Sequence, residues 1–137
     1  MTLTNKLQNK LHTQIPLTKH MQINVKEYSK TQLITTAPLD ININDKGTAF
    51  AGSLSTLLTI SSWSMCWLIS QELGFKDTSI VIFKNETQFL KPVYGNLFCH
   101  TNKPTAKEID ILKGKLLTKK SGSILIQSAI LEENNRC

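Results

Sequence analysis

Apolar residues near the start of the chain recur at every fourth position. Leu3, Leu7 and Leu11 fall on one stripe of a helix, and Pro16 interrupts the pattern. The sequence therefore predicts a helix over Thr2–Gln14 that stops at this proline.

Two segments after this helix have the pattern of strands. Apolar and polar residues alternate from Met21 to Tyr28, as expected for a strand buried on one face. The segment Thr31–Ala37 is rich in β-branched residues, which favour strands. We expect an antiparallel hairpin, followed by a loop of turn-forming residues over Pro38–Gly47.

A long helix is predicted from Gly52 to Leu73, with Gly74 at its carboxyl-terminal cap. Its apolar residues lie around most of the circumference rather than along one stripe. A helix that is apolar on nearly all sides is a buried helix. We therefore expect a sheet that wraps around it.

The remaining segments complete a single domain over residues 1–137. Strands are expected over Ser79–Leu90, Gly95–Asn102 and Ser123–Leu131, and a short exposed helix over Thr105–Leu117. One antiparallel sheet around one central helix is an α+β architecture.

The composition is that of a globular domain, with 40% hydrophobic and 19% charged residues among 137. The first residues lack the pattern of a secretory signal, and no apolar run is long enough to span a bilayer, so we expect a cytoplasmic protein. Cys66, Cys99 and Cys137 have no paired spacing and the histidines lie far apart. Neither disulfides nor a metal site are expected.

The net charge is +6, and many of the lysines lie between Lys103 and Lys120. These lysines either form a solvated face or attract an anionic partner, such as coenzyme A phosphates, an acidic carrier protein or nucleic acid. Aromatic residues make up only 7% of the chain and no base-stacking motif is visible, so nucleic acid is the weakest of these partners.

Two segments carry a resemblance to a known family. The first is Asn42–Ser53, which leads into the long helix, and the second is Phe89–Asn96, with the sequence Phe-Leu-Lys-Pro-Val-Tyr-Gly-Asn. Together with the opening segment Leu7–Leu17 they resemble the hotdog-fold thioesterase domain of the YiiD C-terminal type, over nearly the whole chain. The family usually has one more strand after the segment ending near Glu132, whereas this chain ends at Cys137.

The resemblance implies a hotdog fold, in which an antiparallel sheet wraps around the long central helix. It also implies a homodimer, or a dimer of dimers, with the site at the dimer interface. The substrate would be an acyl thioester of coenzyme A or of acyl carrier protein. No cofactor is expected beyond the coenzyme A or phosphopantetheine that forms part of the substrate.

Thioester hydrolysis needs donors to the carbonyl oxygen, an attacking water and a proton acceptor. The start of the long helix can supply donors, because its first backbone N–H groups are free and its dipole is positive there. On this ground Gly52 and Ser53 are assigned to catalysis, and Phe50 and Ala51 to substrate binding. In the preceding loop, the resemblance favours a catalytic Asn44 and, less strongly, a substrate-binding Asn42, although asparagines in such loops also cap turns.

Many hotdog thioesterases carry an acidic residue seven positions after the helix-start glycine, where this chain has Thr59. Thr59 shares a stripe with Ser55, Ser62 and Cys66, whose small side chains either line a pocket or let the helix pack closely on the sheet. We assign Thr59 to catalysis and Ser55, Ser62 and Asn85 to substrate binding.

The general base is the open question of the sequence. A threonine does not act as a base near neutral pH without help, so Asp40 and Asp45 in the loop are the candidates. Cys66 and Cys99 are expected to be packed side chains rather than nucleophiles.

Two alternatives to hydrolysis remain. Decarboxylation of a malonyl thioester needs no base, because the departing CO2 leaves its charge on the thioester oxygen, where an oxyanion hole stabilises it. The missing helix carboxylate also permits a non-catalytic module that binds an acyl thioester or its carrier protein.

Overall fold

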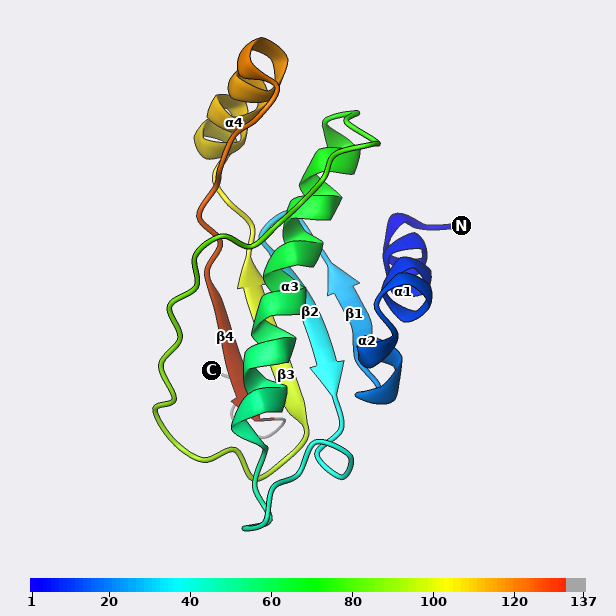
Figure 1. Cartoon of the computed structure of the whole chain (residues 1–137), viewed down its shortest axis with the longest axis vertical. Helices are drawn as coiled ribbons and strands as arrows, with labels where there is room; N and C mark the ends of the chain where they lie inside the picture. Colours follow the sequence, from blue (N-terminus) through cyan, green and yellow to red (C-terminus); the bar gives the residue numbers. More distant parts are fainter. Residues whose placement is uncertain (133–137) are drawn as a thin grey trace.

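The computed structural model describes residues 1–132, which form an antiparallel sheet with a long helix across one face (Figure 1). The sheet order is β1-β2-β3-β4, and each strand pairs antiparallel with its neighbour. The strands are β1 (Asn24–Tyr28), β2 (Gln32–Ala37), β3 (Leu97–Asn102) and β4 (Ser128–Glu132). The long helix is α3 (Ala51–Glu72), which contacts β2, β3 and β4. The predicted α+β plan of a sheet around one long helix is therefore confirmed.

The predicted amino-terminal helix is confirmed as α1 (Leu3–Gln14), which buries Leu7 and Leu11 completely. Pro16 ends this helix but also begins a short one, α2 (Pro16–His20), that the sequence analysis missed. Proline is favoured at the first helical position, because that position needs no backbone N–H.

The predicted hairpin is confirmed, but its first strand begins at Asn24 rather than at Met21. Gln22 has a positive φ of 58°, which turns the chain out of the extended conformation just before the strand. Met21 and Ile23 are nevertheless buried as the alternation predicted.

The core lies between α3 and the inner face of the sheet. Buried α3 side chains meet buried strand residues that alternate along β2 and β3, such as Leu33 and Leu97. Two buried hydroxyls also meet there, because Thr35 and Ser61 form a hydrogen bond of 2.5 Å. Polar groups in a core need such partners.

The predicted strand over Ser79–Leu90 is wrong. This segment forms no strand in the described structure. In Figure 1 it crosses α3 near the end of that helix and then descends along the outer side of β4. Its alternating side chains remain exposed, with Val81 at 75% and Phe83 at 80%. The predicted last strand is shorter than expected, since β4 begins only at Ser128. A strand needs a neighbour to pair with, and a local pattern does not supply one.

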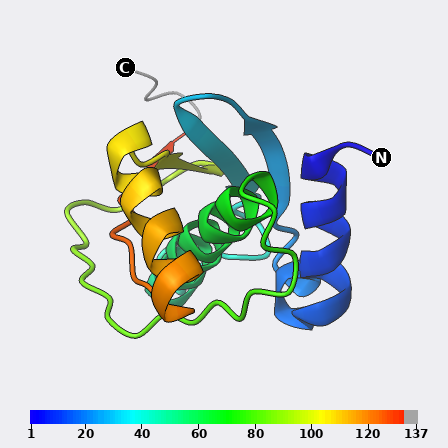
Figure 2. The ribbon, with the colours of Figure 1, turned by 90° about the horizontal axis from the view of Figure 1, so that it is seen from above.

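The predicted exposed helix is α4 (Ala106–Lys119), which buries no residue and projects away from the sheet (Figures 1 and 2). Thr105 and Glu108 form a capping box at its start, which satisfies two backbone donors. It ends at Lys120, whose φ of 58° is left-handed.

The described residues end before the point at which the family has its further strand, so that expectation lies outside them. Within residues 1–132, no helix has the length and apolar character needed to cross a membrane.

Candidate functional site

A cavity with a volume of about 1230 Å³ lies along α3. Its walls are one face of α3, the extended segment 78–93 and the segment 122–132, and two leucines of α4 also reach it. The α3 residues that line it are Leu54, Leu58, Thr59, Ser62, Cys66 and Ser70. An elongated and mostly apolar cavity with a few polar groups is typical of sites for small organic ligands.

One polar contact crosses this cavity at the middle of α3. The side-chain amide of Asn85 donates a hydrogen bond of 3.3 Å to the Thr59 hydroxyl. The Asn85 carbonyl oxygen accepts a bond of 2.6 Å from Thr87, which fixes the orientation of the amide. The structure thus brings together two predicted site residues that are 26 positions apart in the chain.

A second polar group lies one helical turn further along. The Ser62 hydroxyl is 3.2 Å from that of Ser128, which is in turn 2.8 Å from that of Thr101. Ser62 and Ser128 line the cavity, whereas Thr101 is fully buried on β3. The cavity wall therefore carries hydroxyls that are held from behind by the sheet.

The two cysteines near this wall are poor nucleophiles. Burial raises the pKa of the Cys66 thiol to about 11, and burial also raises the pKa of Cys99. A thiol with a raised pKa carries little thiolate at neutral pH. The prediction that both are packed side chains agrees with these values.

The residues assigned to the start of α3 surround a smaller hollow of about 430 Å³ beside α2. Asn42, Phe50, Gly52 and Ser53 all line it. No side chain caps this end of α3. The first backbone N–H groups of a helix also have no acceptor within the helix, because no helical turn precedes them. Ala51, the first residue of α3, is exposed there.

Gly52 has a packing role at this end. The Phe50 ring lies directly over its Cα, in the space that a Cβ would occupy. The absence of a side chain at Gly52 thus accommodates an aromatic ring in this structure.

The two asparagines of the loop are held by hydrogen bonds within the fold. The Asn42 amide is 2% exposed and donates to the carbonyl oxygens of Met21 and Pro38, at 3.0 and 2.8 Å. The Asn44 amide donates to the Thr48 hydroxyl at 2.8 Å and its oxygen accepts from the backbone N–H of Lys46. These bonds are those of turn-forming asparagines.

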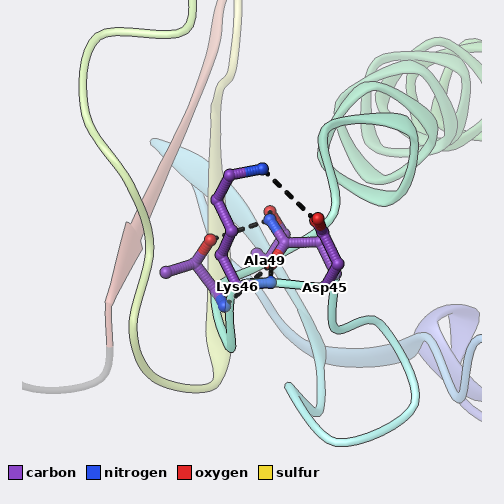
Figure 3. Close-up of polar contacts among 5 residues, drawn as sticks. Asp45, Lys46 and Ala49 are labelled. Atoms are coloured by element: carbon purple, nitrogen blue, oxygen red, sulfur yellow. Dashed lines mark hydrogen bonds and ion pairs between the residues drawn. The ribbon is translucent and has the colours of Figure 1, made fainter.

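The carboxylates proposed as bases do not reach the cavity. Asp45 is exposed and pairs with Lys46 at 3.3 Å in the loop before α3 (Figure 3), and neither Asp40 nor Asp45 lines the cavity. Ser55 lines neither the cavity nor the smaller hollow.

Two other carboxylates, Glu86 and Glu132, line the cavity and were not identified from the sequence. Glu132 accepts a hydrogen bond from the backbone N–H of Tyr94. Glu86 falls in a segment predicted as a strand, and Glu132 directly follows the predicted last strand, Ser123–Leu131. Their position could not be recognised, because no motif marks them.

Gly52 and Thr59 are seven residues apart, which places them on one face of α3 but about 10 Å apart along its axis. One thioester carbonyl can therefore be polarised at the helix start or at Thr59, but not at both. The assignments of Asn44, Gly52, Ser53 and Thr59 remain predictions. Among residues 1–132 no three His, Cys, Asp or Glu side chains cluster as metal ligands would.

The model of a protein family described as "Putative thioesterase (yiiD_Cterm)" matches residues 4–137. A solved structure of a protein of unknown function from Chlorobaculum tepidum is similar, with a TM-score of 0.93 and 28% identity, over 98% of this chain and 82% of that one. A protein from Shewanella oneidensis described as a putative thioesterase has a TM-score of 0.85 and 28% identity, over 98% and 90%.

A third solved structure is that of a Pseudomonas aeruginosa protein of unknown function, described as a probable thioesterase. Its TM-score is 0.69 at 15% identity, over 98% of this chain and 88% of that one, so it bears on the fold alone. Together the matches confirm the hotdog fold that the sequence predicted.

Proposed function

The chain belongs to the family of yiiD C-terminal thioesterase domains, and we propose that it hydrolyses an acyl thioester whose acyl chain lies in the cavity along α3. The observation that carries this proposal is the combination of an apolar cavity of about 1230 Å³ with a polar contact at its middle, between Thr59 and Asn85. The apolar walls suit an acyl chain, and the polar contact suits its thioester.

The Thr59 hydroxyl and the Asn85 amide polarise the thioester carbonyl in this proposal. Asn85 uses one amide proton on Thr59, which leaves its second amide proton and the Thr59 hydroxyl proton for the substrate oxygen. Donors that are already oriented stabilise the negative charge that develops on this oxygen during attack. Water adds to the carbonyl carbon, the C–S bond breaks, and the products are a carboxylic acid and a thiol.

The proton of the attacking water passes to a carboxylate. Among residues 1–132, the carboxylates that line the cavity are those of Glu86 and Glu132, and a base must lie within hydrogen-bonding reach of the water. The variants Glu86→Gln and Glu132→Gln are tested one at a time. The variant whose kcat falls identifies the base.

The active unit in this proposal is a homodimer. Among the described residues, the segment 79–92 pairs with no strand, and it exposes apolar side chains, including Phe83 and Leu90. An exposed, unpaired edge of this kind is a template for pairing with another chain. Light scattering coupled to size exclusion should give twice the chain mass of 15.4 kDa, or four times that mass for a dimer of dimers. A monomer at the assay concentration contradicts this part of the proposal.

Malonyl decarboxylation is a second candidate, favoured by the absence of acidic residues from Ala51 to Gln71 of α3. A carboxylate on this face would repel the malonyl carboxylate, whereas Thr59 does not. In this reaction the bond between the carboxylate and the α-carbon breaks, CO2 leaves, and the enolate takes up a proton to give the acetyl thioester.

The test is product analysis by mass spectrometry. The protein is incubated separately with malonyl and octanoyl thioesters of coenzyme A and of acyl carrier protein. Free octanoic acid and thiol support hydrolysis, and acetyl thioester from the malonyl substrate supports decarboxylation. If no substrate gives a product, the proposed activity is wrong, and the non-catalytic binding module is the alternative that remains.

A further inference from the structure

We infer that the second half of α4 and the turn after it form a docking surface for an acidic carrier protein that presents the acyl thioester to the cavity. This inference rests on the proposed function and names the partner that delivers its substrate. Four observations carry it: the charge of this part of the chain, its position beside the cavity, its convex shape and its exposed apolar side chains.

The positive charge is concentrated at this end of the helix. Residues 113–120 contain four lysines and no acidic residue, and all four lysines are exposed. None of them takes part in an ion pair described for residues 1–132. These lysines, which we call the α4 lysines, are Lys113, Lys115, Lys119 and Lys120. They attract an acidic surface over a distance of about one Debye length, near 10 Å.

The α4 lysines lie at the edge of the cavity. Leu112 and Leu116 of α4 line its wall, as does Gly122 just after the helix. At 100° per residue, Lys113 lies on one flank of the stripe formed by these two leucines, and Lys115 and Lys119 lie on the other. A partner held by the lysines would therefore stand over the side of the cavity where α4 meets it.

The shape of α4 favours a protein over a nucleotide. The helix projects from the body of the molecule (Figures 1 and 2), and the lysines extend over about 10 Å of its length. Side chains that diverge from a convex helix do not converge on one phosphate group, and none of the α4 lysines lines a cavity or hollow described here.

The same surface exposes apolar side chains between its charges. Leu117 is 63% exposed, and Ile111, which lies just before the second half of α4, is 52% exposed. Apolar residues among charges of one sign match a protein surface of opposite charge, because protein interfaces combine apolar contacts with a polar rim. The phosphates of free coenzyme A offer no apolar counterpart to Ile111 and Leu117.

The test compares the wild-type protein with a charge-reversal variant, Lys113→Glu with Lys119→Glu. A matched control, Lys6→Glu with Lys19→Glu, makes the same change of net charge at exposed lysines of α1 and α2. Those helices lie on the other side of the molecule from α4 in both views (Figures 1 and 2). Three substrates carry the same octanoyl group, on acyl carrier protein, on coenzyme A and on pantetheine alone.

The charge-reversal variant should lose on the order of tenfold or more in kcat/KM with the octanoyl carrier protein, since steering by clustered charges contributes about 10- to 1000-fold to association. Activity with octanoyl-pantetheine, which has no partner to dock, should stay within about twofold of wild type. The loss should shrink at high salt, because screening weakens exposed charges. The neutral variant Lys113→Gln with Lys119→Gln should be intermediate.

Three outcomes would overturn the inference. In the first, kcat/KM falls equally with all three substrates, and in the second it falls equally with the coenzyme A and carrier-protein substrates. In the third, the control variant loses as much kcat/KM as the charge-reversal variant. Binding of a carrier protein with a non-hydrolysable octanoyl amide, followed by fluorescence anisotropy, separates docking from chemistry. If the wild-type protein turns over none of the substrates but binds this carrier and the variant does not, the proposed function fails while the docking surface stands. If both bind equally, the docking surface is wrong.

Discussion

The amide of Asn85 donates to the hydroxyl of Thr59 across 3.3 Å, so the extended segment 78–93 contacts the middle of α3 inside the cavity. Thr59 occupies the position where many hotdog thioesterases have a carboxylate. In the proposed site, a pair of neutral hydrogen-bond donors from two distant parts of the chain stands in the place of that charged side chain.

Replacing Thr59 by Val keeps the shape of the side chain but removes its hydroxyl. We expect kcat to fall by about a hundredfold, as when one donor to an oxyanion is removed, while Thr59→Ser should retain most of the activity. Steady-state kinetics with an octanoyl thioester gives the answer. The matched control is Thr56→Val, because Thr56 lies on the same helix but lines the smaller hollow. Full activity of Thr59→Val would indicate that the reacting carbonyl binds at the start of α3 instead.

Asn42→Ala should destabilise the fold by about 2 kcal/mol, because the carbonyl oxygens of Met21 and Pro38 lose a donor in a buried place. Chemical denaturation measures this change. The exposed Asp45→Asn, whose ion pair with Lys46 lies in solvent, should shift the free energy of unfolding by less than about 0.5 kcal/mol. Unchanged stability of Asn42→Ala together with lost activity would instead assign Asn42 to the substrate.

Gly52→Ala should force the Phe50 ring away from the start of α3, because the added Cβ would occupy the space of the ring. Alanine itself favours the helix by up to about 1 kcal/mol over glycine. In a double-mutant cycle, the change should therefore be more favourable for stability in the Phe50→Ala background than in the wild type. Additive effects would show that the ring moves without cost.

Tyr28 should make the stability depend on alkaline pH. Burial, together with its hydrogen bond of 2.6 Å to Glu72, raises the pKa of Tyr28 to about 12 from its ordinary 10. Between these values the unfolded chain has released the phenolic proton and the folded chain has kept it, so stability falls as pH rises.

Urea denaturation at pH 8, 10 and 11 checks this prediction by comparing the wild type with Tyr28→Phe. The half-buried Cys66 and the buried Cys99 also have raised pKa values and give a fall of the same sign, but that fall is common to both proteins. The wild type should lose more stability than the variant above pH 10. Parallel curves for the two proteins would contradict the assignment.

The sequence by itself determined the helices and strands that form for local reasons. The fourfold spacing of Leu3, Leu7 and Leu11 predicts α1, and the apolar circumference of residues 52–73 predicts a buried helix, because burial of apolar area is the main force that folds such segments. The hairpin of β1 and β2 followed from alternation. The motifs before α3 and around Pro92 identified the family, which the comparison over residues 4–137 confirmed.

Only the tertiary structure decided which residues meet. Segment 79–90 alternates like a strand, yet pairing depends on a neighbouring edge that no local pattern contains. The same is true of the cavity, where Asn85 and Glu132 approach α3 from segments far away in the chain. The tertiary structure also committed the Asn42 amide to the backbone carbonyls of Met21 and Pro38. Distances between segments follow from packing, and packing is a property of the whole fold rather than of any stretch of sequence.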